Sequence, residues 1–142
     1  GTVDVVGVIE AAQAARVALA EQADEARRVG VLNHALRHGL AQWAPPQPVI
    51  LSPPQASPWI LAFAIPGREG AVVMRLLAER DIVIGTGSAC SAESGRTSHV
   101  LKAMGVPTAL ARSALRVSFG RDSTMAHVDA LLQALRGVVE AY

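Results

Sequence analysis

The single cysteine of the chain, Cys90, lies in the stretch GTGSACSAESG, residues 85–95. Glycines and small polar residues surround the thiol, a composition typical of a loop that packs poorly and moves easily. Free cysteine is often buried, so an inert packing role is the competing interpretation. Because filler cysteines usually belong to a periodic apolar element, the neighbours of Cys90 favour a reactive thiol, suited to peroxide sensing, acyl transfer or sulfur transfer.

The charged side chains that could assist such a thiol are mostly arginines. Arg96 lies at the end of the cysteine stretch, and Arg116 and Arg121 follow further along the chain. A guanidinium can favour a thiolate or bind a carboxylate through two parallel hydrogen bonds, although an arginine alone is more often a solvated surface residue. Lys102 is the only lysine, so chemistry that needs a side-chain amine has one candidate.

The histidines give no comparable signal. His34 and His38 are one helical turn apart and could share a metal ion, but without a third nearby ligand a solvated helix face is the better interpretation. His99 follows Cys90, yet no Cys-His nucleophile signature is present. We therefore expect no metal site.

Length and composition bound the remaining possibilities. A chain of 142 residues that is 51% hydrophobic predicts one globular domain. The net charge is +1, and the sequence contains no block of like charges, so neither nucleic acid nor a membrane surface is an expected partner. The longest apolar run, residues 59–65, is too short to span a bilayer, and a lone cysteine fits a reducing compartment, so we expect a cytoplasmic protein.

The N-terminal part of the chain predicts one long helix. From Val5 to about Gln42, apolar residues recur at helical spacing, interrupted only by Gly30. An unbroken helix of this length would measure about 55 Å, whereas a compact domain of this size is about 35 to 40 Å across. We therefore expect the segment to kink near Gly30 or to project toward a further part of a larger architecture, with two shorter helices as the alternative.

Short apolar segments predict the strands of a small sheet. Residues 114–120 alternate, so that Leu115, Val117 and Phe119 face the core while Arg116 faces the other way. Further strands are expected at 49–51, 59–65 and 81–85, the last of which ends where the cysteine stretch begins. Helices are expected over 68–80, 99–104, 108–111 and from about 125 onward, with Thr97 or Ser98 and Ser123 or Thr124 as caps.

The order of these motifs resembles the C-terminal part of the cysteine desulfurases, pyridoxal-phosphate enzymes of the class V aminotransferase family. The stretches GTGSACSAESGRTSHVLKAMG and ALARSALRVSFGR match the family's Ser-Gly-Ser-Ala-Cys loop, the helix after it and the Arg-hydrophobic-Ser-hydrophobic-Gly-Arg strand, in order and without a gap. The resemblance covers essentially the whole chain and is strongest from Ile82 to Arg121. It implies the small α/β sandwich domain of a fold-type I pyridoxal-phosphate enzyme, with a short sheet, packed helices and a long N-terminal helix.

The resemblance also implies roles for individual residues. Cys90 matches the loop nucleophile that attacks the sulfur of L-cysteine, which leaves L-alanine and a persulfide on the thiol. Arg116 matches the arginine that holds the substrate carboxylate. Thr2 matches a threonine that reaches the cofactor phosphate of the neighbouring subunit in a homodimer. The loop residues that position the thiol are Thr86, Gly87, Ser88 and Ala89.

The chain lacks a lysine at the position where such enzymes form the Schiff base. In the family that lysine and the acidic partner of the pyridine nitrogen lie upstream, in a large domain. Lys102 matches an unrelated helix position. We therefore expect residues 1–142 to be a C-terminal small domain, with residues 1–42 linking it to an absent large domain, and to bind no pyridoxal phosphate and be inactive alone.

The function implied for the intact enzyme is the supply of persulfide sulfur to an acceptor or scaffold protein, for iron-sulfur cluster or thio-cofactor synthesis. Two alternatives remain open at this point. The chain could be a non-catalytic persulfide carrier, or a class V aminotransferase relative in which Cys90 is incidental. The resemblance does not decide between cysteine and selenocysteine as substrate.

Overall fold

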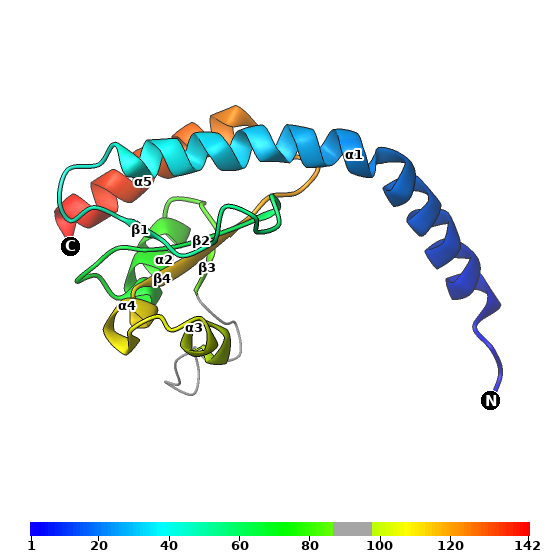
Figure 1. The fold of residues 1–142 in the computed structure, drawn as a ribbon. Coiled ribbons are helices and arrows are strands. Elements are labelled where there is room, and N and C mark those ends of the chain that lie inside the picture. The colour runs from blue at the N-terminus through cyan, green and yellow to red at the C-terminus, as the bar shows by residue number, and fades with distance from the viewer. Residues whose placement is uncertain (87–97) are drawn as a thin grey trace.

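The computed structural model describes residues 1–86 and 98–142 of the chain. In this part, four strands form one antiparallel sheet in the order β1-β2-β4-β3 (Figure 1). The strands are β1 (Val49–Ile50), β2 (Ile60–Ala64), β3 (Gly85–Thr86) and β4 (Ala114–Ser118). The two longest strands, β2 and β4, pair along their whole length and form the centre of the sheet.

Helices cover one face of this sheet more fully than the other. The long helices α1 (Val5–Ala41) and α5 (Met125–Ala141) lie side by side over the sheet, and α2 (Gly70–Ala78) packs against α5 and β4 (Figure 1). These elements share one hydrophobic core. The short helices α3 (His99–Ala103) and α4 (Thr108–Arg112) form a smaller cluster, in which Leu101 and Ala111 pack with Ala114 of β4. The architecture is the expected α/β one.

Strand β4 confirms the alternation predicted from the sequence. Leu115 is fully buried in the main core, with Val117 and Phe119 at most 9% exposed. On the other face of the strand, Arg116 is half-buried and Ser118 is exposed. One face of the strand therefore stabilises the core, while the other presents a guanidinium.

Helix α1 runs without interruption through Gly30, so neither a kink at this glycine nor two shorter helices is observed. Its buried residues all lie between Val29 and Leu40. The N-terminal half bends away from the body and projects beyond the sheet (Figure 1). Apolar residues there remain largely exposed, at 60% for Val5 and 72% for Leu19. The helical periodicity is therefore present over the whole segment, but only its second half packs on this domain.

The prediction of a strand over residues 81–85 is wrong for residues 81–84, because the end of α2 determines the path of these residues. The amide of Ile82 donates to the carbonyl oxygen of Leu77 and that of Asp81 to the carbonyl oxygen of Ala78, with Asp81 at φ 58°. This is the Schellman arrangement that ends many helices. It holds Ile82 close to the helix, so that pairing with β4 begins only at Gly85.

Helices α3 and α5 begin at caps that the sequence predicted. The Ser98 side chain accepts a hydrogen bond from the amide of Leu101 at the start of α3, and Thr124 accepts one from His127 at the start of α5. Ser123 has a different role, since its hydroxyl accepts from the amide of Gly120. Within the described ranges, every helix is too short or too polar to cross a membrane.

Candidate functional site

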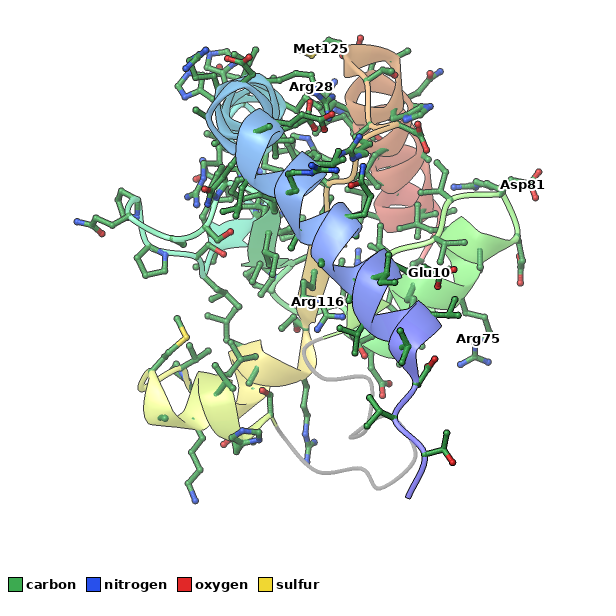
Figure 2. All side chains as sticks on the ribbon, turned by 90° about the vertical axis from the view of Figure 1, so that its right-hand side faces the viewer. Glu10, Arg28, Arg75, Asp81, Arg116 and Met125 are labelled. Atoms are coloured by element: carbon green, nitrogen blue, oxygen red, sulfur yellow. The ribbon has the colours of Figure 1, made fainter. Side chains whose placement is uncertain are left out.

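Arg116 lies at the centre of the more open face of the sheet (Figure 2). In the antiparallel pairing its direct neighbours are Ala62 on β2 and Gly85 on β3. Directly opposed residues of neighbouring strands place their side chains on the same face. Ala62, Arg116 and Gly85 therefore form a row across three strands. Arg116 has the only large side chain in this row.

The guanidinium of Arg116 lies against the backbone of Gly85. A β-carbon added at Gly85 would lie 3.2 Å from one terminal guanidinium nitrogen and 3.5 Å from both Cζ and Nε. Among the described residues, none forms an ion pair with Arg116. A positively charged fork on an open sheet face can bind a carboxylate through two parallel hydrogen bonds.

The cysteine stretch begins directly beside this arginine. Gly85 and Thr86 form β3, with Gly85 opposite Arg116 and Thr86 opposite Leu115. Thr86 therefore lies on the face of the main core rather than beside the guanidinium. The other predicted members of the stretch lie outside the described residues: Gly87, Ser88, Ala89 and Cys90.

Thr2 lies apart from this arrangement. It is exposed and precedes the first turn of α1, at the far end of the projecting helix (Figure 1). The structure thus brings Arg116 and the start of the cysteine stretch together and does not bring Thr2 to them. The role predicted for Thr2, toward a neighbouring subunit, stays a prediction.

Among the described residues, the one lysine of the chain does not lie in a pocket that could hold pyridoxal phosphate. Attachment of this cofactor requires a lysine in the pocket that holds it. Lys102 is exposed on α3, which packs on the sheet through the neighbouring Leu101. In residues 1–86 and 98–142, no group of three potential metal ligands is found either. The chemistry present in the described residues is therefore that of an anion-binding arginine beside the cysteine stretch.

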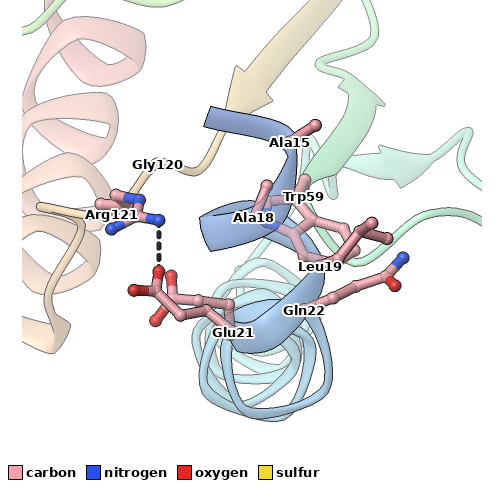
Figure 3. Close-up of a pocket in the computed structure, with 9 residues that line it drawn as sticks. Ala15, Ala18, Leu19, Glu21, Gln22, Trp59, Gly120 and Arg121 are labelled. Carbon is pink, nitrogen blue, oxygen red and sulfur yellow. Dashed lines mark ion pairs between the residues drawn. The ribbon is translucent and has the colours of Figure 1, made fainter. Parts of the chain in front are cut away.

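Arg121, the other described arginine considered for the thiol, makes a structural contact. It forms an ion pair with Glu21 of α1, at the rim of a hollow of about 640 Å³ between the projecting half of α1 and the sheet (Figure 3). Ala18, Leu19 and Trp59 also line this hollow. The ion pair joins Arg121 to α1.

A second ionic contact fixes α1 nearby. Arg28 donates two hydrogen bonds of 2.9 Å to the carboxylate of Glu25, and it also donates to the carbonyl oxygens of Gly120 and Ser123. The hydrogen bonds from Arg28 hold the pKa of the Glu25 carboxyl below its usual value, and the same contact raises the pKa of Arg28. These contacts join α1 to the segment that links β4 to α5 (Figure 2).

Gly85 is a residue of this arrangement that the sequence did not predict. Composition places this glycine among the flexible residues around the thiol, whereas the structure places it in a strand and under a guanidinium. The signal that could have identified it is its place in an antiparallel pair opposite Arg116, which becomes visible only when the register is known.

The sequence of the chain matches known proteins along most of its length. Residues 1–131 match the aminotransferase class-V family. The chain is 38% identical to an IscS-like cysteine desulfurase of Mycobacterium tuberculosis, a match that covers 98% of the chain and 36% of the relative. It is also 38% identical to the cysteine desulfurase IscS of Anaeromyxobacter dehalogenans, over 91% of the chain and 31% of the relative. The chain thus spans about a third of the length of the curated relatives it matches.

The fold gives the same result. A solved NifS-like protein superposes on the whole chain with a TM-score of 0.85 and 28% sequence identity, and the match covers 35% of that protein. The small sheet, the packed helices and the long first helix are therefore those of a domain of a fold-type I pyridoxal-phosphate enzyme. Sequence and structure together show that the chain belongs to the aminotransferase class-V family, and that it is similar to about a third of proteins named as cysteine desulfurases or NifS-like proteins.

Proposed function

We propose that this chain supplies the thiol and the carboxylate-binding arginine of a cysteine desulfurase that acts on L-cysteine. Cys90 is the nucleophile, and Arg116 holds the substrate carboxylate. The observation that carries the proposal is the pairing of Gly85 with Arg116, because it sets the guanidinium beside the strand that leads into the cysteine stretch. The similarity to cysteine desulfurases supports the same assignment.

The proposed reaction balances without an external oxidant or reductant. The thiolate of Cys90 forms a bond to the sulfur of L-cysteine while the bond between that sulfur and the β-carbon breaks. The β-carbon keeps the electron pair and takes up a proton. The products are L-alanine and a persulfide on Cys90, from which the terminal sulfur passes to an acceptor thiol.

Arg116 contributes binding and orientation in this scheme. A carboxylate held by two parallel hydrogen bonds has a fixed direction as well as a fixed position, so the sulfur of the substrate can be presented repeatedly to the same thiol. The directly opposed neighbours of Arg116, Ala62 and Gly85, are small, so neither of them fills the space beside the guanidinium.

The family implies pyridoxal phosphate for the intact enzyme. We propose that the Schiff-base lysine belongs to the two thirds of such an enzyme that this chain does not match, and that residues 1–142 form its small domain, with residues 1–42 as the link. The homodimer, the role of Thr2 within it, delivery to a scaffold protein for iron-sulfur cluster or thio-cofactor synthesis, and the cytoplasmic location are parts of the same proposal.

The test is alanine production from L-cysteine by the purified protein at its natural length with pyridoxal phosphate, comparing Cys90→Ser and Arg116→Ala with the unchanged protein. We expect Cys90→Ser to abolish both alanine formation and the persulfide trapped by an alkylating reagent, while the absorbance of bound cofactor is retained. We expect Arg116→Ala to raise KM for L-cysteine by about 10- to 100-fold, the loss expected for a charge-assisted hydrogen bond.

Arg112→Ala is the matched control for the arginine, because Arg112 is exposed on α4. It should leave KM unchanged. Full alanine production by Cys90→Ser would show that the cysteine is incidental and would overturn the proposal. A protein that accepts persulfide on Cys90 but forms no alanine would instead be a carrier.

A further inference from the structure

We propose that Gly85 is a positioning residue for Arg116: the side chain it lacks leaves the space in which the guanidinium lies across β3. This inference rests on the carboxylate-binding role proposed above for Arg116. It adds a residue that acts on the substrate only through the arginine.

A β-carbon at Gly85 would meet three of the four heavy atoms of the guanidinium rather than its tip alone. The distances from an ideal β-carbon at Gly85 to Nη2, Cζ and Nε of Arg116 are 3.2, 3.5 and 3.5 Å. These three atoms run from the base of the group through its centre to one end, so the plane of the fork runs beside the strand. A methyl group at this position would move the guanidinium by a few tenths of an ångström, and a branched side chain would displace it from the strand.

The backbone gives no other reason for a glycine here. Gly85 has no φ in the left-handed range, unlike Gly67 and Gly105 at φ 77° and 74°. Glycine weakens a strand, because it loses more backbone freedom on folding and has no side chain to pack. The space beside Arg116 is thus the feature of the described residues that accounts for a glycine at this position.

The position of the fork determines how it meets a carboxylate. Two parallel hydrogen bonds form only when both donor nitrogens face the same two oxygens, so a small rotation of the guanidinium breaks one of the bonds. Substitution of Gly85 should therefore weaken substrate binding in proportion to the size of the new side chain, without touching the substrate itself.

The kinetic test compares Gly85→Ala and Gly85→Val in the purified protein at its natural length with pyridoxal phosphate. We expect KM for L-cysteine to rise about twofold for alanine and about tenfold for valine, with kcat changed less than KM. Gly120→Ala is the matched control, because a β-carbon at Gly120 meets nothing within 4 Å. In an Arg116→Ala background, Gly85→Val should produce no further rise in KM, since it acts through the arginine. If Gly85→Val raised KM as much in the Arg116→Ala background as in the unchanged protein, the inference would be overturned.

A second readout does not depend on activity. In a ¹H–¹⁵N spectrum of arginine Nε groups, the resonance of Arg116 is identified by its loss in Arg116→Lys. We expect this resonance to shift in Gly85→Val and to stay in place in Gly120→Ala. An unshifted resonance would overturn the positioning role. The resonance could shift in a protein that forms no alanine, or in one whose KM is unchanged by Arg116→Ala. Either result would support the positioning role of Gly85 and contradict the proposed function.

Discussion

The guanidinium of Arg28 donates a hydrogen bond of 2.9 Å to the carbonyl oxygen of Gly120, 92 residues further along the chain. The same side chain donates to Ser123 and is held by the carboxylate of Glu25. These contacts lie just before Val29, the first buried residue of α1. The direction in which the exposed half of α1 leaves the domain is therefore linked to the turn that follows β4.

Replacing Glu25 by Gln should remove a pH-dependent part of the stability. The pKa of Glu25 is lowered in the folded protein, chiefly by the hydrogen bonds from Arg28, so the ionised carboxylate favours folding. This contribution is present above the unfolded-state pKa of about 4.5 and is lost as the pH falls through the lower folded-state value. We expect Glu25→Gln to lower Tm at pH 7 and to match the unchanged protein at strongly acidic pH.

Asp129→Asn serves as the control for this pH series. Asp129 is exposed on α5 and forms no ion pair with another described residue. Asp129→Asn should lower Tm at pH 7 less than Glu25→Gln does, because it removes no ion pair among the described residues. A constant difference for Glu25→Gln across the same range would contradict the linkage to Arg28.

Two glycines of α1 should respond in opposite directions to substitution by alanine. Gly30 has nothing within 4 Å of an added β-carbon, so Gly30→Ala should raise the free energy of unfolding by about 0.5 to 1 kcal/mol through helix propensity. At Gly39 the added carbon would lie 2.3 Å from Cδ1 of Leu132. This overpacking should outweigh the gain in helix propensity, so Gly39→Ala should lower the free energy of unfolding by about 1 kcal/mol. Urea denaturation measures both, and equal effects would refute the close packing of α1 on α5.

Asp81→Gly should stabilise the protein by about 0.5 to 1 kcal/mol, because Asp81 takes the left-handed conformation that glycine adopts without steric cost. Asp81 is exposed, so its side chain contributes little packing. Gly105 ends α3 in the same conformation and with the same hydrogen-bond pattern, so Gly105→Ala should destabilise by about 1 kcal/mol. Thermal unfolding measures both, and a lower Tm for Asp81→Gly would contradict the account of this helix end.

Lys102 should not carry the cofactor. Its side chain is exposed on α3, where a Schiff base would be open to hydrolysis by water. We expect Lys102→Ala to form alanine from L-cysteine at the rate of the unchanged protein. Borohydride reduction with pyridoxal phosphate, followed by peptide mapping, should find no label on residues 99–104, and a labelled Lys102 would refute this assignment.

The local patterns of the sequence predicted the elements that carry their own periodicity. The alternation in β4 identified Leu115 and Val117 as core residues and Arg116 as available. In α1 the periodicity predicted the helix but not which half of it is buried. Burial depends on contacts with α5, which the residues of α1 do not specify by themselves.

The candidate site was predicted only in part, for a related reason. The resemblance identified Arg116, but the glycine beneath its guanidinium depends on β3 pairing with β4, which is a contact between segments about 30 residues apart. The expected strand at 81–85 failed because α2 ends in a Schellman arrangement, which hydrophobicity alone does not reveal. The prediction for Cys90 stays a prediction, since it lies outside the described residues.

The pairing of β2 with β4 has a consequence for how this domain can vary in length. Since side chains alternate along a strand, one residue inserted or deleted within Ala114–Ser118 would exchange the two faces. Arg116 would then turn into the hydrophobic layer, and a leucine or valine would take its place on the open face. Insertions should be better tolerated in the connection between α1 and β1, which belongs to no strand, whereas a single-residue change of length inside β4 should disturb the core and displace the arginine at once.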